Sequence, residues 1–243
     1  MTHYLLIFLC VIFFALAHFF NAISLFARVS GKLANRPYLS QALEKIAQIF
    51  SMGFIILFAP LLAFITESLF STKNYLLLVT LSQSVSGILL AWIYFWRFKL
   101  LSRLNYAMFS FQSKKHFLLE IFRSFRSRIH EKSGLEGIES STKYKYFLSG
   151  FCINIFLASG FFSAFYFASL YPEYRLTLSQ LAAFIHGIGA LIQGLYADPA
   201  LGRTFDSAQK PEWWSAFLSY FWGKWFAFVV LTSFFFLLYL LQT

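Results

Sequence analysis

The sequence predicts an all-α integral membrane protein with about six transmembrane helices and one cytoplasmic amphipathic helix. Of its 243 residues, 59% are hydrophobic and only 12% are charged, whereas a soluble domain carries about a quarter charged residues. Apolar stretches of about 20 residues, the length that crosses a bilayer, recur along the chain. No polar segment is long enough to form a separate soluble domain. We therefore expect residues 1–243 to form a single transmembrane domain.

The hydropathy places the spans, within a few residues, at 4–27, 46–69, 75–98, 146–171, 178–197 and 213–241. The N-terminus lacks both a basic region and a small-residue cleavage site, so 4–27 is expected to be a span rather than a cleaved signal peptide. We expect Pro60 to kink the second span. In the fifth span, polar residues accompany three glycines, a composition typical of a helix packed against other helices. We therefore expect the fifth span to lie at the centre of the bundle.

The basic residues are distributed unevenly between the two sides of the membrane. The net charge is +10, and outside the spans only Lys73 and Arg175 fall on one side. Because basic loops stay cytoplasmic, both termini are expected to face outward. Basic clusters beside apolar spans indicate contact with anionic lipid headgroups, and we expect no nucleic-acid partner.

The connection at about 99–145, with Arg97 just before it, carries eleven of the 20 basic residues. In "KKHFLLEIFRSFRSRIHEK", apolar residues recur at helical spacing while lysines and arginines take much of the remaining circumference. A basic helix with an aromatic face is typical of segments that lie in the membrane interface. We expect this segment to bind the cytoplasmic surface.

Motifs for enzymatic chemistry are absent from the sequence. It contains no phosphate-binding loop, dinucleotide fingerprint, H-E-x-x-H or G-x-S-x-G. The five histidines are scattered, and Cys10 and Cys152 lie in apolar runs without metal-site spacing. We therefore expect no cofactor and no metal, although six helices can assemble a site from distant residues.

Polar groups inside the spans are the candidate functional residues, because such groups are costly in a membrane unless they face a cavity or a partner. His18 and Asn21 share one face of the first span, and Arg28 follows about two turns later. Structural alternatives remain open: His18 can bond a neighbouring helix, and Arg28 can be a cytoplasmic anchor. Lys224 lies within the sixth span, and we expect its side chain to extend to the cytoplasmic interface.

The stretch "GLYADPALGRTFD" follows the fifth span. The residue before a proline disfavours helical geometry, so Asp198–Pro199 is expected to end that span. Arg203 and Asp206 follow in what we expect to be a short loop. An acid can hold an arginine while the guanidinium binds phosphate, although a salt-bridged loop without a ligand remains an alternative.

Three stretches resemble the Amj family of lipid II flippases. "HFFNAISLFARVSGKLA" is similar to the start of that family, "FAPLLAF" to its proline-bearing second helix, and "YPEYRLTLSQLAAFIHGIGALIQGLYADPALGRTFD" to its most distinctive region. The family tends to place an acid three residues after the histidine, where this chain has Asn21. If that acid takes part in ion coupling in the family, this chain lacks the charged group at that position. The residues that match the family pattern are His18, Arg28, Gly31, Pro60, Pro172, Arg175, Ser179, Gly187, Asp198, Pro199 and Asp206.

The resemblance implies transport of undecaprenyl-pyrophosphate-linked peptidoglycan precursor (lipid II) across the bacterial cytoplasmic (inner) membrane, as an alternative to MurJ. We expect Arg28 and Arg203 to contact phosphate and Asp198 and Asp206 to orient them. Other expected contributors to the substrate path are His18, Asn21, Arg175, Gln180, His186 and Gln193. Two alternatives remain: a membrane enzyme acting on a prenyl-phosphate lipid, and a non-transporting assembly or regulatory subunit. The sequence does not determine the oligomeric state or the energy source.

Overall fold

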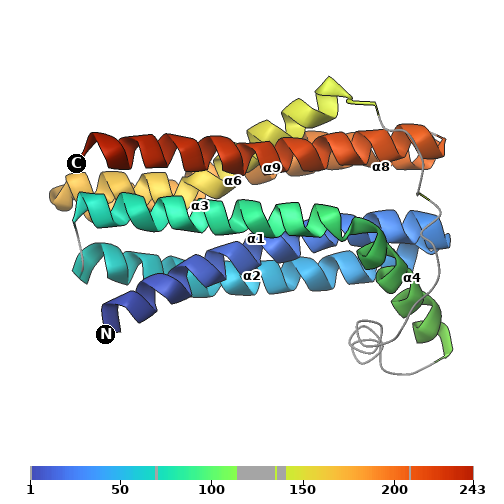
Figure 1. The fold of residues 1–243 in the computed structure, drawn as a ribbon, viewed down its shortest axis with the longest axis horizontal. Helices are drawn as coiled ribbons and strands as arrows, with labels where there is room; N and C mark the ends of the chain where they lie inside the picture. Colours follow the sequence, from blue (N-terminus) through green and yellow to red (C-terminus); the bar gives the residue numbers. More distant parts are fainter. Residues whose placement is uncertain (1, 69–70, 114–134, 136–140, 208, 243) are drawn as a thin grey trace. The chain divides into compact units, whose positions relative to one another are not determined.

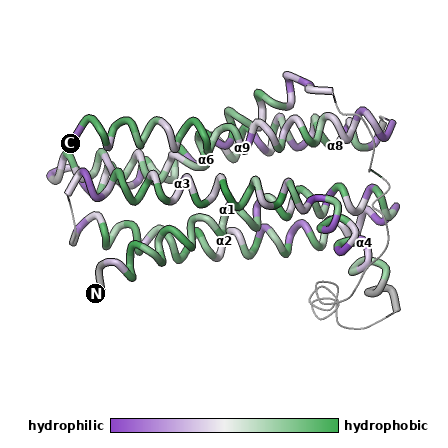
Figure 2. The backbone as a smooth tube through the Cα atoms, in the orientation of Figure 1, coloured by the Kyte–Doolittle hydropathy of each residue, from purple (hydrophilic) through white to green (hydrophobic). Residues whose placement is uncertain are grey.

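The structure is a computed structural model that describes residues 2–68, 71–113, 135, 141–207 and 209–242, and every regular element among them is a helix (Figure 1). This confirms the all-α fold class. Apolar residues occupy the middle turns of the long helices, and hydrophilic residues gather towards helix ends (Figure 2). Among the described residues, six helical segments are long and apolar enough to cross a membrane, at Tyr4–Ala34, Pro37–Glu67, Thr72–Phe95, Tyr144–Leu170, Arg175–Asp206 and Lys210–Leu241.

The chain divides into two compact units. Unit 1 comprises Met1–Leu16, Phe54–Ile88 and Glu139–Thr243, and unit 2 comprises Ala17–Gly53 and Leu89–Ile138. Three long helices contribute to both units: α1 (Thr2–Ala34), α2 (Pro37–Ser68) and α3 (Thr72–Phe95).

In unit 2, α1 and α2 form a tight helical hairpin. Asn35 adopts a left-handed conformation with φ 54°, which asparagine tolerates better than most residues. The N–H of Arg36 then donates to the carbonyl of Gly31 at 2.9 Å, a bond that closes the end of α1. Pro37 begins α2, where its missing N–H costs nothing. Both helices therefore extend beyond the apolar spans that the sequence predicts.

Within the described residues of unit 2, α4 (Arg97–Ser113) packs against the hairpin. Ser30 on α1 donates a 2.5 Å hydrogen bond to Oδ1 of Asn105 on α4. Ala27, Leu43 and Met108 form a buried cluster of α1, α2 and α4. The helix α4 covers the first part of the predicted amphipathic connection, but the "KKHFLLEIFRSFRSRIHEK" segment lies outside the described residues.

In unit 1, α6 (Tyr144–Leu170) and α9 (Lys210–Leu241) run in the same direction in close contact (Figure 1). Two glycines permit this approach. A Cβ at Gly150 would overlap the carbonyl oxygen of Tyr220, and one at Gly223 would overlap the carbonyl oxygen of Phe147. Glycine is therefore required at both positions for the backbones to touch.

Side-chain hydrogen bonds tie α3 to this pair of helices. The hydroxyl of Tyr75 donates to the carbonyl of Phe162 at 2.6 Å. Nε1 of Trp225 on α9 donates to the carbonyl of Gly87 at 3.1 Å. These two bonds run between neighbouring helices, so they hold α3 against α6 and α9 in unit 1.

The predicted break at Asp198–Pro199 is wrong. The helix α7 (Arg175–Ile192) passes through a π-helical turn (Gln193–Ala197) into α8 (Asp198–Ser207) without a loop. The N–H of Asp198 donates to the carbonyl of Gln193, five residues earlier. A π turn widens the helix by one residue, which makes room for the ring of Pro199 and its missing N–H. Arg203 and Asp206 therefore lie on a helix.

The expectation that the fifth span is central is also wrong. Arg175–Asp206 is the least buried of the six candidate spans, with 11% of its most apolar window buried. Gly189 packs against Leu157 of α6, but a Cβ at Gly187 or Gly194 would meet nothing within 4 Å. The glycines lie on different sides of α7, and only the side that carries Gly189 is packed against α6.

Candidate functional site

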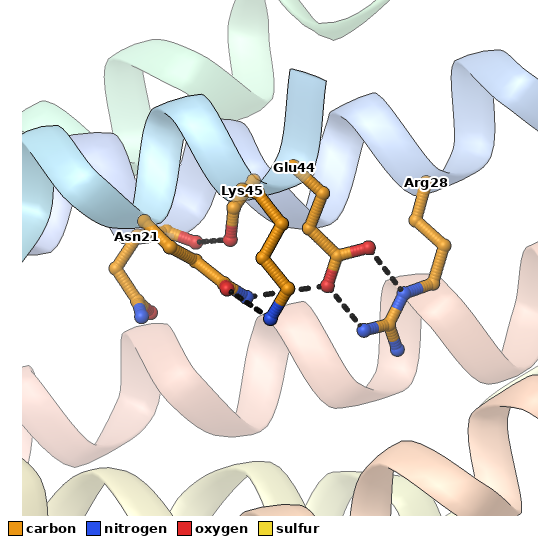
Figure 3. Close-up of polar contacts among 6 residues, drawn as sticks. Asn21, Arg28, Glu44 and Lys45 are labelled. Atoms are coloured by element: carbon orange, nitrogen blue, oxygen red, sulfur yellow. Dashed lines mark hydrogen bonds and ion pairs between the residues drawn. The ribbon is translucent and has the colours of Figure 1, made fainter. Parts of the chain in front are cut away.

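The site with the clearest geometry joins Arg28 on α1 to Glu44 on α2 (Figure 3). Nε of Arg28 donates to Oε2 of Glu44 at 3.2 Å, and Nη2 donates to Oε1 at 2.5 Å. This is a bidentate, charge-assisted pair, which fixes the plane of the guanidinium. The side chains are 22% and 11% exposed, so the pair is only partly open to solvent.

Two further residues of α2 extend this pair. Nε2 of Gln48 donates to Oε1 of Glu44 at 3.2 Å, and Nζ of Lys45 donates to Oε1 of Gln48 at 3.0 Å. Arg28, Glu44, Lys45 and Gln48 are called the Arg28 cluster below. Because it contains two cations and one carboxylate, the cluster keeps an excess of positive charge. Such a cluster favours an anionic ligand.

The α1–α2 hairpin holds this cluster in place. Gly31 lies one turn beyond Arg28, where any Cβ would overlap the side chain of Ser40 on α2. Ser40 in turn lies one turn before Glu44. The close helix approach at Gly31 therefore brings the two charged side chains within hydrogen-bonding distance.

Sequence reasoning missed Glu44 and expected Asp198 and Asp206 to orient Arg28. The structure pairs Arg28 with Glu44, within unit 2. One feature of the sequence could have pointed to Glu44 as the partner of Arg28, because Glu44 is the first acidic residue of the chain. Its pairing depends on the length of the hairpin turn, which hydropathy does not give.

His18 and Asn21 lie deeper along α1 in unit 2. His18 is 5% exposed, and it precedes Arg28 by ten residues, or about 15 Å of helix. Asn21 is half-buried, and its carbonyl accepts a 2.7 Å bond from Oγ of Ser24. His18, Asn21 and Arg28 are thus spread along α1 and do not form one contact set.

The remaining predicted residues lie on the α7–α8 rod of unit 1. Arg175 begins α7, and Arg203 lies near the end of α8. These residues are 28 positions apart, which corresponds to roughly 40 Å of helix. One phosphate therefore cannot contact both arginines at once, although both can lie along one substrate path.

The middle of this rod carries three predicted polar residues. Gln180 is exposed, and Gln193 is half-buried at the start of the π turn. Nδ1 of His186 lies 3.2 Å from the carbonyl of Leu157, which places this histidine against α6. In the middle of this rod, the polar side chains that remain accessible are therefore the amides of Gln180 and Gln193, whereas His186 lies against α6.

On α8, Arg203 and Asp206 are exposed and lie three residues apart, so they project from neighbouring positions on the helix. Nε of Arg203 also points to the carbonyl of Pro199 at 3.4 Å. Asp198 begins α8 directly after the π turn, inside the continuous α7–α8 helix. Within the described part of the chain, no group of three His, Cys, Asp or Glu side chains could hold a metal ion.

Comparison with known families decides the relationship of this chain. The family model described as "Amj: Alternate to MurJ" matches residues 12–216. The chain belongs to the Amj family. No curated protein and no solved structure matches it.

Several residues that match the Amj pattern have structural explanations. Gly31 permits the close approach of α1 and α2, and Pro199 accompanies the π turn. Pro60 lies inside α2, which continues to Ser68. Gly187 faces open space and has no packing role within the described structure. Arg28, one of these residues, forms an ion pair with Glu44.

Proposed function

We propose that this protein flips lipid II, the undecaprenyl-pyrophosphate-linked peptidoglycan precursor, from the inner to the outer leaflet of the bacterial cytoplasmic membrane. The description of the Amj family as an alternate to MurJ supports this role, as do six helices suited to crossing a bilayer. The distribution of basic residues supports an orientation with both termini outside. The protein acts as a transporter and not as an enzyme.

The task of such a protein is to lower an electrostatic barrier. The head of lipid II carries two phosphates and many sugar and peptide polar groups. Hydrocarbon offers these groups no hydrogen bonds, and each unsatisfied group costs several kcal/mol. A flippase lowers this cost by lining a path with cations and amides, while the prenyl tail remains in lipid.

The observation that carries the proposal is the Arg28 cluster. Arg28 lies about two turns from the end of α1, on the side of the membrane where the basic loops gather. Glu44 fixes the guanidinium by two hydrogen bonds, and exposed Lys45 adds a second cation. A preoriented arginine beside a lysine fits a pyrophosphate better than a neutral or zwitterionic headgroup. We assign initial capture of the lipid II phosphates to this cluster.

The other residues are assigned to the path. Arg203 contacts phosphate on the same membrane side, with Asp198 and Asp206 orienting it. Arg175 receives the head near the outer side. The remaining assigned path residues are His18, Asn21, Gln180, His186 and Gln193. The basic connection at about 99–145 holds the cytoplasmic rim against anionic lipids.

A replacement experiment tests the function. Cells are depleted of their other lipid II flippase so that this protein is the only substitute, and precursor exposed on the outer surface is measured. The wild-type protein should sustain growth and surface exposure. Arg28→Ala should abolish both while the protein still inserts at normal abundance. Normal rescue by Arg28→Ala would refute the site assignment.

Two controls sharpen this test. Arg36→Ala removes an arginine from the same helix end, where its guanidinium lies 4.7 Å from the ring of Phe109 and outside the cluster. It should rescue normally. Arg28→Lys keeps the charge but loses the bidentate fork, and we expect partial rescue. Chemical conversion of the lipid by purified protein would instead indicate an enzyme, and translocation only with a stoichiometric partner would indicate a subunit.

A further inference from the structure

A hollow lies between the start of α6 and the middle of α9, within unit 1. Its volume is about 270 Å³, and its lining residues are Thr142, Phe147, Ser219, Trp222, Trp225 and Phe226. Trp222 is 37% exposed and Phe226 is 42% exposed, so the hollow opens at the surface of the protein on the side of these two rings.

Four of the lining residues are aromatic, and their rings form the walls. The ring centroids of Trp222 and Trp225 lie 5.3 Å apart with an interplanar angle of 87°, so these two side chains make a corner. The ring of Phe226 lies 5.9 Å from that of Phe147 and 5.8 Å from that of Phe151. The aromatic surface therefore continues from the hollow along α6 and α9, away from the start of α6.

Two polar groups of the lining are already engaged in hydrogen bonds. Oγ of Ser219 donates to the carbonyl of Ser215 at 2.7 Å and accepts from the N–H of Lys143 at 2.8 Å. Nε1 of Trp225 donates to the carbonyl of Gly87 at 3.1 Å. A water molecule is held in place only by several polar partners. The hollow therefore favours an apolar occupant over water.

A positive charge borders the hollow where α6 begins. Lys143 is the residue before α6, and it directly follows Thr142, which lines the hollow. Its backbone is tied to a second lining residue, Ser219. A lysine carries its ammonium on a flexible four-carbon stem, so the charge of Lys143 can reach an anion at the opening.

Lys224 does not provide a second cation at this opening. We expected its side chain to extend to the cytoplasmic interface, but it is 1% exposed. Lys224 lies two residues from both Trp222 and Phe226, so it projects from roughly the opposite side of α9. A Cβ at Gly150 of α6 would lie 3.2 Å from the amide nitrogen of Lys224, which places this side of α9 against α6.

We propose that the hollow binds the isoprene units next to the phosphate of a polyprenyl-phosphate-linked lipid, with the anionic head at Lys143. An isoprenoid chain carries a methyl branch and a double bond in every unit, so it is wider and has fewer rotatable bonds than a straight acyl chain. It therefore fills a corner between aromatic rings with a smaller loss of conformational freedom. The rest of the chain remains in lipid.

This inference rests on the proposed function, because it names the part of lipid II by which the protein distinguishes this lipid from phospholipids. A phospholipid such as phosphatidylglycerol also carries a phosphate, which Lys143 would attract equally well. The shape of the hollow, and not the charge beside it, is therefore the source of the selectivity.

The test uses purified full-length protein in nanodiscs of phosphatidylcholine. The probe is undecaprenyl phosphate with a photoreactive diazirine on the isoprene unit next to the phosphate, and labelled peptides are identified by mass spectrometry. Labelling should concentrate on the residues that line the hollow. Unlabelled undecaprenyl phosphate should compete at several-fold lower concentration than undecaprenol, which lacks the charge, or phosphatidylglycerol, which lacks the branched chain.

Two pairs of variants assign the walls and the charge. Trp222→Ala removes an exposed wall and should reduce labelling several-fold, whereas Trp92→Ala, at a 49% exposed tryptophan of unit 2, should label as wild type. Lys143→Met should remove the advantage of undecaprenyl phosphate over undecaprenol. Lys145→Met is its control and should keep that advantage, because Nζ of Lys145 lies over the ring of Tyr196, 5.5 Å from its centroid.

A filling variant keeps the test decisive if Trp222→Ala does not fold. Thr142 is exposed and precedes α6, so Thr142→Trp should fold normally while it fills the hollow and abolishes labelling there. Wild-type labelling of Thr142→Trp would overturn the proposal. Labelling spread evenly over the outer faces of the helices, or equal competition by phosphatidylglycerol, would do the same.

A transport measurement on the same protein separates this site from the proposed function. If wild type flips a fluorescent lipid II analogue in liposomes but the probe does not label the hollow, the binding site is wrong and the flippase proposal stands. If the probe labels the hollow but no lipid II analogue is flipped, the proposed function is wrong and the binding site stands.

Discussion

Replacing Gly31 with alanine tests whether the close approach of α1 and α2 positions the Arg28 cluster. The added Cβ would overlap both Cβ and Oγ of Ser40. Carbon atoms in contact need about 3.5–4.0 Å, so the helices must separate by roughly 1–2 Å at this point. A movement of that size would break the 3.2 Å bond between Arg28 Nε and Glu44 Oε2, which lies one turn away.

The magnitude follows from three contributions. Overpacking costs about 1–3 kcal/mol. Loss of a hydrogen bond to a charged group costs about 1.5–3 kcal/mol. Alanine regains about 1 kcal/mol over glycine in helix propensity. Gly31→Ala is therefore expected to lower the free energy of unfolding by about 1.5–5 kcal/mol, which is a large share of a typical stability.

A second substitution tests whether the clash with Ser40 causes the loss of stability. Ser40→Gly removes the atoms that the new methyl group meets, so Gly31→Ala/Ser40→Gly should lie within about 1 kcal/mol of wild type. The assay is denaturant-induced unfolding in mixed micelles, followed by the rescue of flippase-depleted cells. If Gly31→Ala is as stable as wild type, or if the double variant is no better than the single one, the close-approach argument fails.

Three further predictions concern packing and pairing. Gly150→Ala should destabilise the protein by about 1–3 kcal/mol in the same unfolding assay, whereas Gly187→Ala should be neutral or stabilise it by up to about 1 kcal/mol; equal effects would contradict the α6–α9 contact. A double-mutant cycle of Arg28→Met and Glu44→Met should give a coupling of about 1–3 kcal/mol, and a coupling near zero would refute the ion pair. Tyr75→Phe should cost about 0.5–1.5 kcal/mol, with no loss if its hydroxyl does not bind a buried carbonyl.

The all-α class and the six spans were predictable because apolar length and composition are local properties of the sequence. Boundaries were less accurate, because a helix can continue past the apolar region. The extension of α1 to Ala34 depends on the left-handed turn at Asn35. The continuation through Pro199 depends on a π turn, a hydrogen-bond shift that no residue pattern marked.

The candidate site was predictable in part. Arg28 follows from charge and depth, but its partner Glu44 follows from the geometry of the hairpin. Glycines were interpreted as packing residues of the fifth span, yet Gly187 and Gly194 face open space, while Gly150 and Gly223 allow the backbones of α6 and α9 to touch. Glycine alone does not indicate which neighbour approaches it.

The sequence alone determined that this chain is a helical membrane protein of the Amj type, because hydropathy and family motifs are carried by the residues themselves. The tertiary structure decided which polar groups meet. Glu44 holds Arg28, and Lys224 is buried where α9 packs against Gly150 of α6. These contacts depend on how helices distant in sequence are packed and rotated, and a single helix carries no record of its neighbour's register.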